Sequence, residues 1–211
     1  DGIDPILPST DTYGLNWLDD RPMNSAVWTK AQVIAALNQS PHLIAHFGHA
    51  NAGYALRMYN ADVSSLTNTA PFFLTSVGCN CGSFDTSDCL AEEFVKRSTS
   101  GAFAVIMNTR YGWFDETDEG LFSGEFMKCF FDELFVQGNR RLGEANQFAR
   151  EDLIGSVETT GEMVYRWCYF EITLFGDPHT RIQAGVLPFT WLQNYGLPTD
   201  GSADLDDPDG D

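Results

Sequence analysis

Three short apolar runs, at residues 42–47, 72–77 and 102–107, most constrain how this chain can fold. Each run is dominated by aromatic, β-branched or other apolar side chains and is preceded by proline or glycine, as buried strands often are. Segments with a helical spacing of apolar residues lie between the runs and after the last one. Strands that are apolar on both sides and alternate with helices predict a three-layer α/β/α sandwich with a mostly parallel sheet.

The helical patterns are found at residues 27–38, 87–96, 117–136 and 142–153. The segment 162–174 fits a helix or a strand equally well, and residues 175–178 predict a turn before a short strand at 180–183. No internal repeat is present. A chain of 211 residues is long enough to bury a core of this kind.

A histidine follows the first apolar run and a cysteine follows the second. His49 and Cys79 are 30 residues apart, about the length that a crossover between parallel neighbours requires. Residues that follow the carboxyl ends of strands in an open α/β sheet meet at one edge, where such folds place their chemistry. The two residues are therefore a candidate nucleophile and acid/base pair.

The chemistry that such a pair supports is acyl transfer. A thiolate is an intrinsically strong nucleophile, and a nearby histidine can accept the thiol proton and later protonate a leaving amine. Backbone amides of Cys79 and Ala50, in tight loops at strand ends, are candidate donors to the oxyanion. The alternative is that Cys79 is a structural thiol and His49 a loop histidine.

Two further alternatives involve neighbouring residues. Cys81 competes with Cys79 for the role of nucleophile, although a residue two positions on projects to the other side of an extended loop. His46, His49, Cys79 and Cys81 also supply four potential zinc ligands, but the Cys-x-Cys spacing is tighter than usual for zinc sites. The remaining three of the five cysteines lie in apolar patterns and are expected to be buried, so no disulfide framework is indicated.

Charge excludes some partners. The net charge of −18 argues against electrostatic binding to nucleic acids or anionic membranes. No apolar run approaches the roughly 18 residues that a membrane span needs, and no signal peptide is visible. The chain starts without Met and stops inside an acidic run, so both ends look like cuts from a longer protein.

Several motifs occur together in an order and spacing that resemble the gingipain-like cysteine peptidases, bacterial relatives of the caspase fold. The resemblance covers about residues 27–184. Its motifs are Gly48-His49, the segment from Asp62 to Asn68, Cys79-x-x-Gly82-x-Phe84-Asp85, residues 101–106 with Thr109-Arg110-Tyr111, Leu142-Gly143-Glu144-Ala145, and Leu174-x-Gly176-Asp177-Pro178.

The resemblance implies a caspase-like fold, with Cys79 as nucleophile and His49 as the catalytic histidine. The family usually has glycine after that histidine, and here the residue is Ala50. Its backbone N–H remains available to an oxyanion, but a positive φ would suit alanine less well. The family's sheet normally has strands before the histidine-bearing one, so upstream strands are expected in the parent protein. We accordingly expect an irregular segment at 1–26 and the peptidase domain at 27–187.

In the relatives, the loop after the third strand lines the pocket for the residue before the scissile bond. Trp113 and Asp115 lie in that loop, which suggests a preference for Arg or Lys in the substrate. The alternative is that Asp115 and the acids after it form a solvated helix N-terminus, favoured by the helix dipole.

Residues 188–211 resemble a linker followed by the opening of an Asp-rich calcium-binding repeat of large secreted bacterial proteins. Asp204, Asp206 and Asp209 are the candidate calcium ligands. A disordered acidic linker explains the same residues equally well.

We therefore expect a secreted or surface-displayed bacterial cysteine endopeptidase that acts on proteins or peptides. It needs no cofactor for catalysis, has calcium as a possible ligand of its tail, and is joined to downstream domains of the same parent chain. The alternative is a catalytically silent copy of the fold that serves as a binding or maturation module in a large calcium-dependent surface protein.

Overall fold

The structure is a computed structural model, and it describes residues 29–85, 87–115, 118, 120–160 and 163–182. Its centre is a four-stranded sheet in the order β1-β4-β5-β6. These strands are β1 (Leu43–His46), β4 (Phe72–Ser76), β5 (Ala102–Asn108) and β6 (Ile172–Gly176). β1, β4 and β5 run parallel, whereas β6 pairs with β5 antiparallel.

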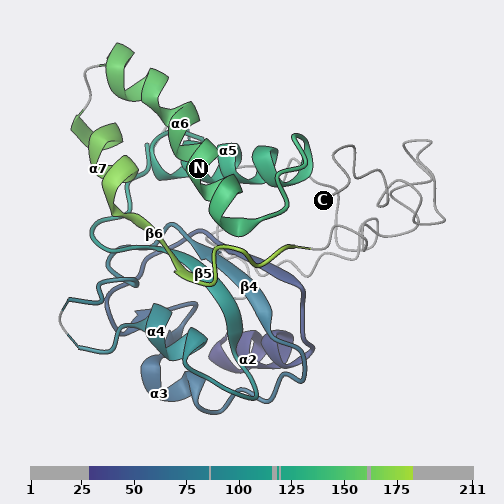
Figure 1. The fold of residues 1–211 in the computed structure, drawn as a ribbon. Coiled ribbons are helices and arrows are strands. Elements are labelled where there is room, and N and C mark those ends of the chain that lie inside the picture. The colour runs from purple at the N-terminus through teal and green to yellow at the C-terminus, as the bar shows by residue number, and fades with distance from the viewer. Residues whose placement is uncertain (1–28, 86, 116–117, 119, 161–162, 183–211) are drawn as a thin grey trace.

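Helices cover both faces of this sheet, as Figure 1 shows. One face carries α2 (Lys30–Asn38), α3 (Asn60–Val63) and α4 (Leu90–Val95). The other carries α5 (Ser123–Phe135), α6 (Leu142–Thr160) and α7 (Met163–Glu171). A small antiparallel hairpin of β2 (Tyr54–Ala55) and β3 (Met58–Tyr59) lies between β1 and α3 in the chain.

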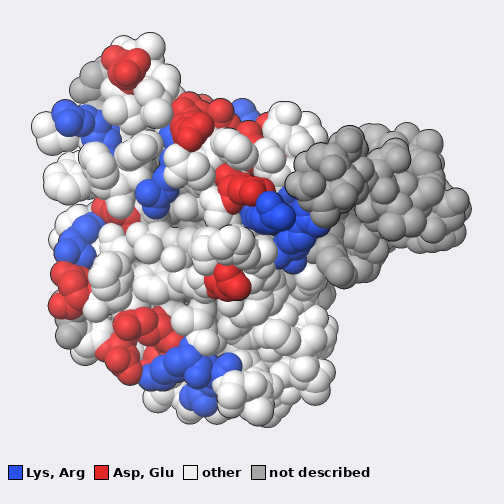
Figure 2. Space-filling view, viewed as in Figure 1, with Lys and Arg blue, Asp and Glu red and all other residues white. Residues whose placement is uncertain are grey.

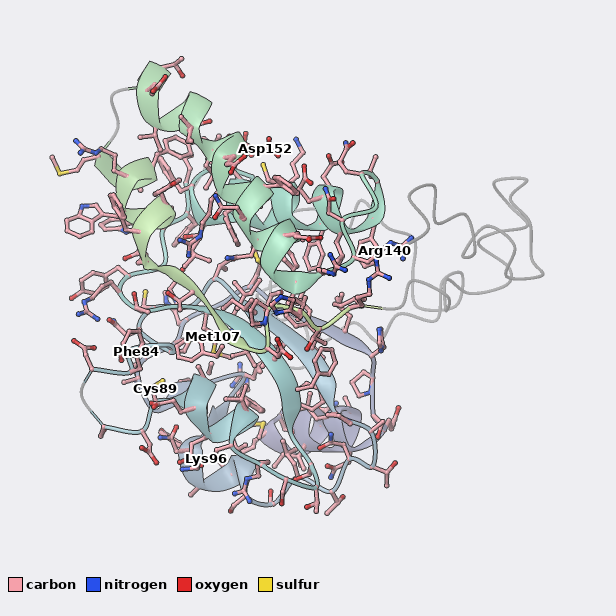
Figure 3. All side chains as sticks on the ribbon, viewed as in Figure 1. Phe84, Cys89, Lys96, Met107, Arg140 and Asp152 are labelled. Carbon is pink, nitrogen blue, oxygen red and sulfur yellow. The ribbon has the colours of Figure 1, made fainter. Side chains whose placement is uncertain are left out.

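Alternation along the strands builds two separate cores. Phe72 and Leu74 of β4 pack with Phe94 of α4 in one core, whereas Phe73 packs with Phe126 and other residues of α5 in the second. The β5 residues divide in the same way, and Figure 3 shows Met107 and Cys89, both members of the first core, on the α4 side. Successive side chains of a strand point to opposite faces, so a strand that is apolar throughout requires a layer on each side.

The described residues thus form a mixed α/β sandwich with a mostly parallel sheet, which confirms the predicted fold class. Two of the motifs hold the sandwich together. The side chain of Asn68 clamps Gly101 at the start of β5, accepting from its N–H and donating to its carbonyl, both at 2.9 Å. At the start of α6, Gly143 donates to the carbonyl of Pro178 at 2.9 Å, which fixes the Gly-Asp-Pro turn against that helix.

The local predictions differ from the structure in the last third of the sheet. The ambiguous segment contains both elements, because α7 ends at Glu171 and β6 begins at Ile172 with no loop between them. The strand predicted at 180–183 is reduced to one isolated bridge between Arg141 and Arg181 within the described residues. The predicted segments 1–26 and 188–211 lie outside the described residues.

Candidate active site

Strand pairing sets the positions of the two candidate residues. In the parallel pair β1–β4, His46 lies opposite Ser76, and the backbone N–H of Val77 donates to the carbonyl of His46 at 3.2 Å. His49 and Cys79 each lie three residues beyond that matched pair. The two loops therefore leave neighbouring strands side by side at the carboxyl edge of the sheet, as the spacing predicted.

The two loops touch each other at Gly78. A Cβ atom at this glycine would lie 2.4 Å from the Cβ of Ala50 and 3.0 Å from the carbonyl oxygen of Gly48. No real side chain tolerates such distances, so glycine is the residue that lets the loops approach this closely. Ala50 is not among the residues with positive φ. The alanine in place of the family's usual glycine is thus unstrained, and its methyl group occupies the space that Gly78 leaves.

The side chain of Cys79 contacts the loop that follows β5. Its side chain is partly exposed, and its Sγ lies 3.7 Å from the carbonyl oxygen of Gly112, in the loop after β5. Gly112 itself passes directly over the loop that precedes Cys79, because a Cβ there would lie 1.8 Å from the carbonyl oxygen of Val77. The side chain of His49 is exposed on the neighbouring loop. The structure thus leaves both groups accessible at one edge.

Cys81 has a different environment. It is completely buried, and its Sγ lies 3.4 Å from the carbonyl oxygen of Gly78 and 3.7 Å from the hydroxyl of Ser76. Burial raises the pKa of the Cys81 thiol to about 12. A thiol with that pKa is almost never a thiolate at neutral pH, so Cys81 is poorly suited to act as the nucleophile.

His46 joins the same buried group. Its Nδ1 lies 2.8 Å from Ser76 Oγ, which also accepts a hydrogen bond from the backbone N–H of Gly78 at 3.1 Å. The His46 imidazole is therefore hydrogen-bonded to Ser76 within the sheet, below the loops. The described residues contain no group of three or more His, Cys, Asp or Glu side chains that could hold a metal ion. The zinc alternative, which needs His46 and Cys81 as ligands, has no geometric support.

Asn108, at the end of β5, is a structural contributor that the sequence did not single out. Its side-chain amide donates to the carbonyls of Val77 at 2.9 Å and Gly78 at 3.3 Å, just before Cys79. Its own carbonyl accepts from Gly82 N–H at 2.9 Å. The loop that carries Cys79 is therefore attached to β5 on both sides of the cysteine.

The two predicted pocket residues lie in the loop after β5, but differ in their surroundings. Trp113 is 37% exposed and its backbone N–H donates to Ser123 Oγ at 3.1 Å. Asp115 accepts from the backbone N–H of Asp118 at 3.2 Å and so helps to order the turn before α5. The helix expected from residue 117 begins at Ser123, so Asp115 does not lie at a helix N-terminus as the alternative supposed.

A second acid, Glu171, lies beneath this loop and was not predicted. It is only 3% exposed, and burial raises the pKa of its carboxyl to about 7. The Arg110 charge and a hydrogen bond from the Trp113 side chain oppose that rise. The Glu171 carbonyl also accepts from the backbone N–H and the hydroxyl of Thr109, at 2.8 and 3.0 Å. The end of α7 thus supports the loop that carries Trp113.

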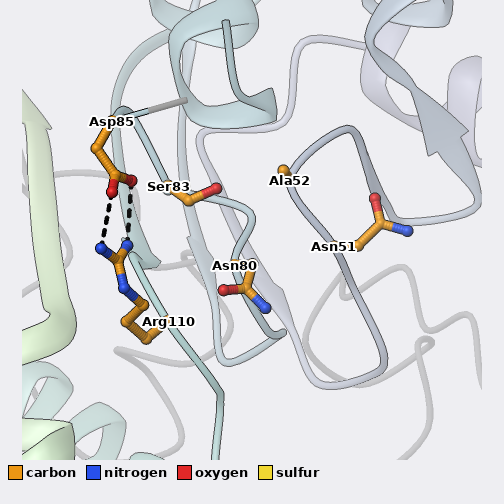
Figure 4. Close-up of a pocket in the computed structure, with 6 residues that line it drawn as sticks. All are labelled: Asn51, Ala52, Asn80, Ser83, Asp85 and Arg110. Carbon is orange, nitrogen blue, oxygen red and sulfur yellow. Dashed lines mark hydrogen bonds and ion pairs between the residues drawn. The ribbon is translucent and has the colours of Figure 1, made fainter. Parts of the chain in front are cut away.

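A polar pocket of about 390 Å³ adjoins both loops. Figure 4 shows the Arg110–Asp85 ion pair at one side of this pocket and Asn51 and Ala52 at the other, with Asn80 and Ser83 between them. The guanidinium binds both carboxylate oxygens, at 3.1 and 2.8 Å, and holds the pKa of Asp85 below its usual range.

Charge elsewhere on the described surface is mixed. Acidic and basic side chains are interspersed on the face drawn in Figure 2. Six of the 30 acidic residues lie in the last twelve positions, beyond the described residues. No helix among the described residues has the length and apolar character needed to cross a membrane.

The fold and the paired loops define a mixed α/β domain with a cysteine and a histidine at one edge of its sheet, and comparison with known families identifies its class. The profile of peptidase family C25 matches residues 8–183, and the chain belongs to this family, the gingipain family of cysteine peptidases. The predicted family is thereby confirmed.

A solved structure described as "Structure of Protease" has a similar fold, with a TM-score of 0.52 and 15% sequence identity. The similarity covers 70% of this chain and 36% of that chain, so the present chain spans about a third of its length. At this identity the similarity establishes the fold alone. No curated protein sequence matches the chain.

Proposed function

We propose that the chain is a cysteine endopeptidase in which Cys79 is the nucleophile and His49 the acid/base. The observation that carries the proposal is the pairing of β1 with β4, which brings an accessible thiol and an accessible imidazole to adjoining loops. The burial of Cys81 and its pKa of about 12 favour Cys79 over its neighbour.

The proposed reaction has two halves. Cys79 Sγ gives its proton to His49 and attacks the peptide carbonyl carbon, which forms a tetrahedral oxyanion facing the backbone N–H groups of Cys79 and Ala50. His49 then protonates the leaving amine as the C–N bond breaks, which leaves a thioester on Cys79. In the second half, water gives a proton to His49 and attacks the thioester, and the released thiolate recovers the proton as the acid product leaves.

Several finer features belong to the same proposal. Family membership and the acidic residues beyond position 188 favour a secreted or surface-displayed protein whose tail binds calcium through Asp204, Asp206 and Asp209. Trp113 lines the pocket for the residue before the scissile bond, with Asp115 the candidate for favouring a basic side chain there. Replacing Asp115 with Asn removes any such preference if the acid acts directly.

The test is cleavage of a proteome-derived peptide library by the chain within its parent protein, with calcium and a thiol reductant, read by mass spectrometry. We expect cleavage by the wild type and by Cys129→Ala, a matched control in α5, and none by Cys79→Ala. Identical peptide profiles for wild type and Cys79→Ala, with both proteins folded and any propeptide removed, would overturn the proposal. They would favour the silent binding module instead.

A further inference from the structure

The polar pocket described above adjoins both loops of the proposed catalytic pair. Asn51 lies two residues after His49, and Asn80 directly follows Cys79. The pocket is therefore lined by residues of both loops, close in the chain to the proposed catalytic pair. Trp113 is not among the residues that line the pocket, so the pocket is distinct from the part of the site that Trp113 faces.

The lining supplies hydrogen-bond donors that a ligand can use. The side-chain oxygen of Asn51 accepts from the backbone N–H of Gly53 at 3.0 Å, so the NH₂ group of this amide is the part left for a ligand. Asp85, the one carboxylate of the lining, has both oxygens engaged by Arg110. The pocket therefore offers no carboxylate oxygen that is free of an ion pair.

Arg110 retains donors of its own. A guanidinium has five N–H groups, and here two are used by Asp85 and one by the carbonyl of Thr109, at 2.7 Å. The described residues supply no acceptor to the others. Its side chain is 49% exposed, and its backbone carbonyl is fixed by the N–H of Asn80 at 2.5 Å. A planar guanidinium held in this way suits a second carboxylate.

We propose that the pocket formed by Asn51, Asn80, Asp85 and Arg110 is a subsite that selects an acidic side chain, Asp or Glu, close to the scissile bond of the substrate. The inference rests on the proposed function. The incoming carboxylate binds the remaining Arg110 donors and the amide of Asn51, while Asp85 keeps the guanidinium in place.

The experiment first finds the position at which the wild type favours Glu in the peptide library, and then compares two peptides that differ only by Glu or Gln there. We expect kcat/KM for the Glu peptide to be about tenfold higher, as charge-assisted hydrogen bonds predict. Arg110→Gln should reduce that ratio to less than twofold. Arg141→Gln, which removes the same charge from an exposed pair with Glu144, should leave it unchanged.

Asp85→Asn should change the Glu/Gln ratio in the opposite direction to Arg110→Gln. It removes the competing negative charge, while the side-chain oxygen of Asn still accepts a hydrogen bond from Arg110 and keeps the guanidinium in place, so the preference for Glu should increase. Unfolding of a variant cannot produce such an increase, so this second variant keeps the test valid if Arg110→Gln does not fold. The inference is wrong if the wild type shows no preference for Glu, if Arg110→Gln retains it, or if Lys is favoured over Gln at the same position. The last result would mean that Asp85 recruits a basic side chain.

Binding separates this inference from the peptidase proposal. Fluorescence polarisation with the Cys79→Ala variant measures affinity for labelled pentapeptide pools in which one position is Glu or Gln. If the wild type cleaves no peptide but the Cys79→Ala variant still binds the Glu pool more tightly, the peptidase proposal alone is refuted. Cleavage without any Glu preference, in either assay, would refute the subsite alone. Equal affinity for the two pools when nothing is cleaved would refute both.

Discussion

Replacing Glu171 with Gln should make the protein more stable at neutral and alkaline pH. The carboxyl is 3% exposed, and its pKa is raised from an ordinary 4.5 to about 7, mainly because burial disfavours the charged form. The native state therefore binds a proton that the unfolded state has lost between these two pH values. Stability contributed by this group falls as pH rises from 4.5 to 7 and is constant above that range.

The size of the effect follows from the same pKa. A rise from 4.5 to about 7, at 1.36 kcal/mol per pH unit, corresponds to roughly 3 kcal/mol of lost stability at pH 8. Glutamine cannot ionise, yet its side-chain oxygen can still accept the hydrogen bond from Trp113. The free energy of unfolding of Glu171→Gln minus that of the wild type should therefore increase by about that amount between pH 4.5 and 8.

The assay is urea unfolding of the full chain at several pH values, followed by tryptophan fluorescence and far-UV circular dichroism. Glu144→Gln is a matched control, because Glu144 forms an exposed ion pair with Arg141 that contributes little. A difference between Glu171→Gln and wild type that stays flat, or decreases, over this pH range would refute the assignment of Glu171 as a buried carboxyl with a raised pKa.

Three further predictions test the loops. Iodoacetamide at pH 8 should label Cys79 before Cys81 in the folded protein, because a pKa of about 12 leaves roughly one Cys81 thiol in ten thousand ionised; peptide mapping that finds Cys81 first would contradict this. Gly78→Ala should destabilise the protein by about 1–3 kcal/mol in urea unfolding, since its methyl would lie 2.4 Å from that of Ala50. The double variant with Ala50→Gly should recover most of the loss, and no recovery would mean that another contact is responsible. Asn108→Ala should cost about 1–3 kcal/mol by removing the amide donor to the carbonyls of Val77 and Gly78, so an unchanged urea midpoint would exclude that role.

The sequence predicted the parts of the fold that repeat a simple pattern. β4 and β5 are apolar on both faces because a helical layer covers each face, and such runs stand out in the sequence. β6 does not stand out in the sequence, because the apolar pattern continues from α7 into the strand without a break at Glu171. Residues 173–175 of β6 are also only partly buried, and the sequence there shows neither the alternation of a strand nor the 3.6-residue spacing of a helix.

The candidate site divides in a similar way. His49 and Cys79 follow two recognisable strands, and their spacing alone indicated that they would be neighbours. The contacts of Glu171 with Trp113 and Thr109 join positions about 60 residues apart and depend on how α7 packs. The sequence offered one signal for Glu171, an acidic residue within an apolar segment. Its contacts with Trp113 and Thr109 follow only from the tertiary structure.

The equal offset of the two loops from the β1–β4 pair has a consequence for how their separation responds to motion. The ladder between β1 and β4 holds the starting points of both loops in register. A slip of one strand along the other would offset these starting points by about 3.3 Å per residue. Such a slip would also turn every side chain of that strand from one core into the other. The starting points of the two loops should therefore stay in register under heating until the sheet itself unfolds.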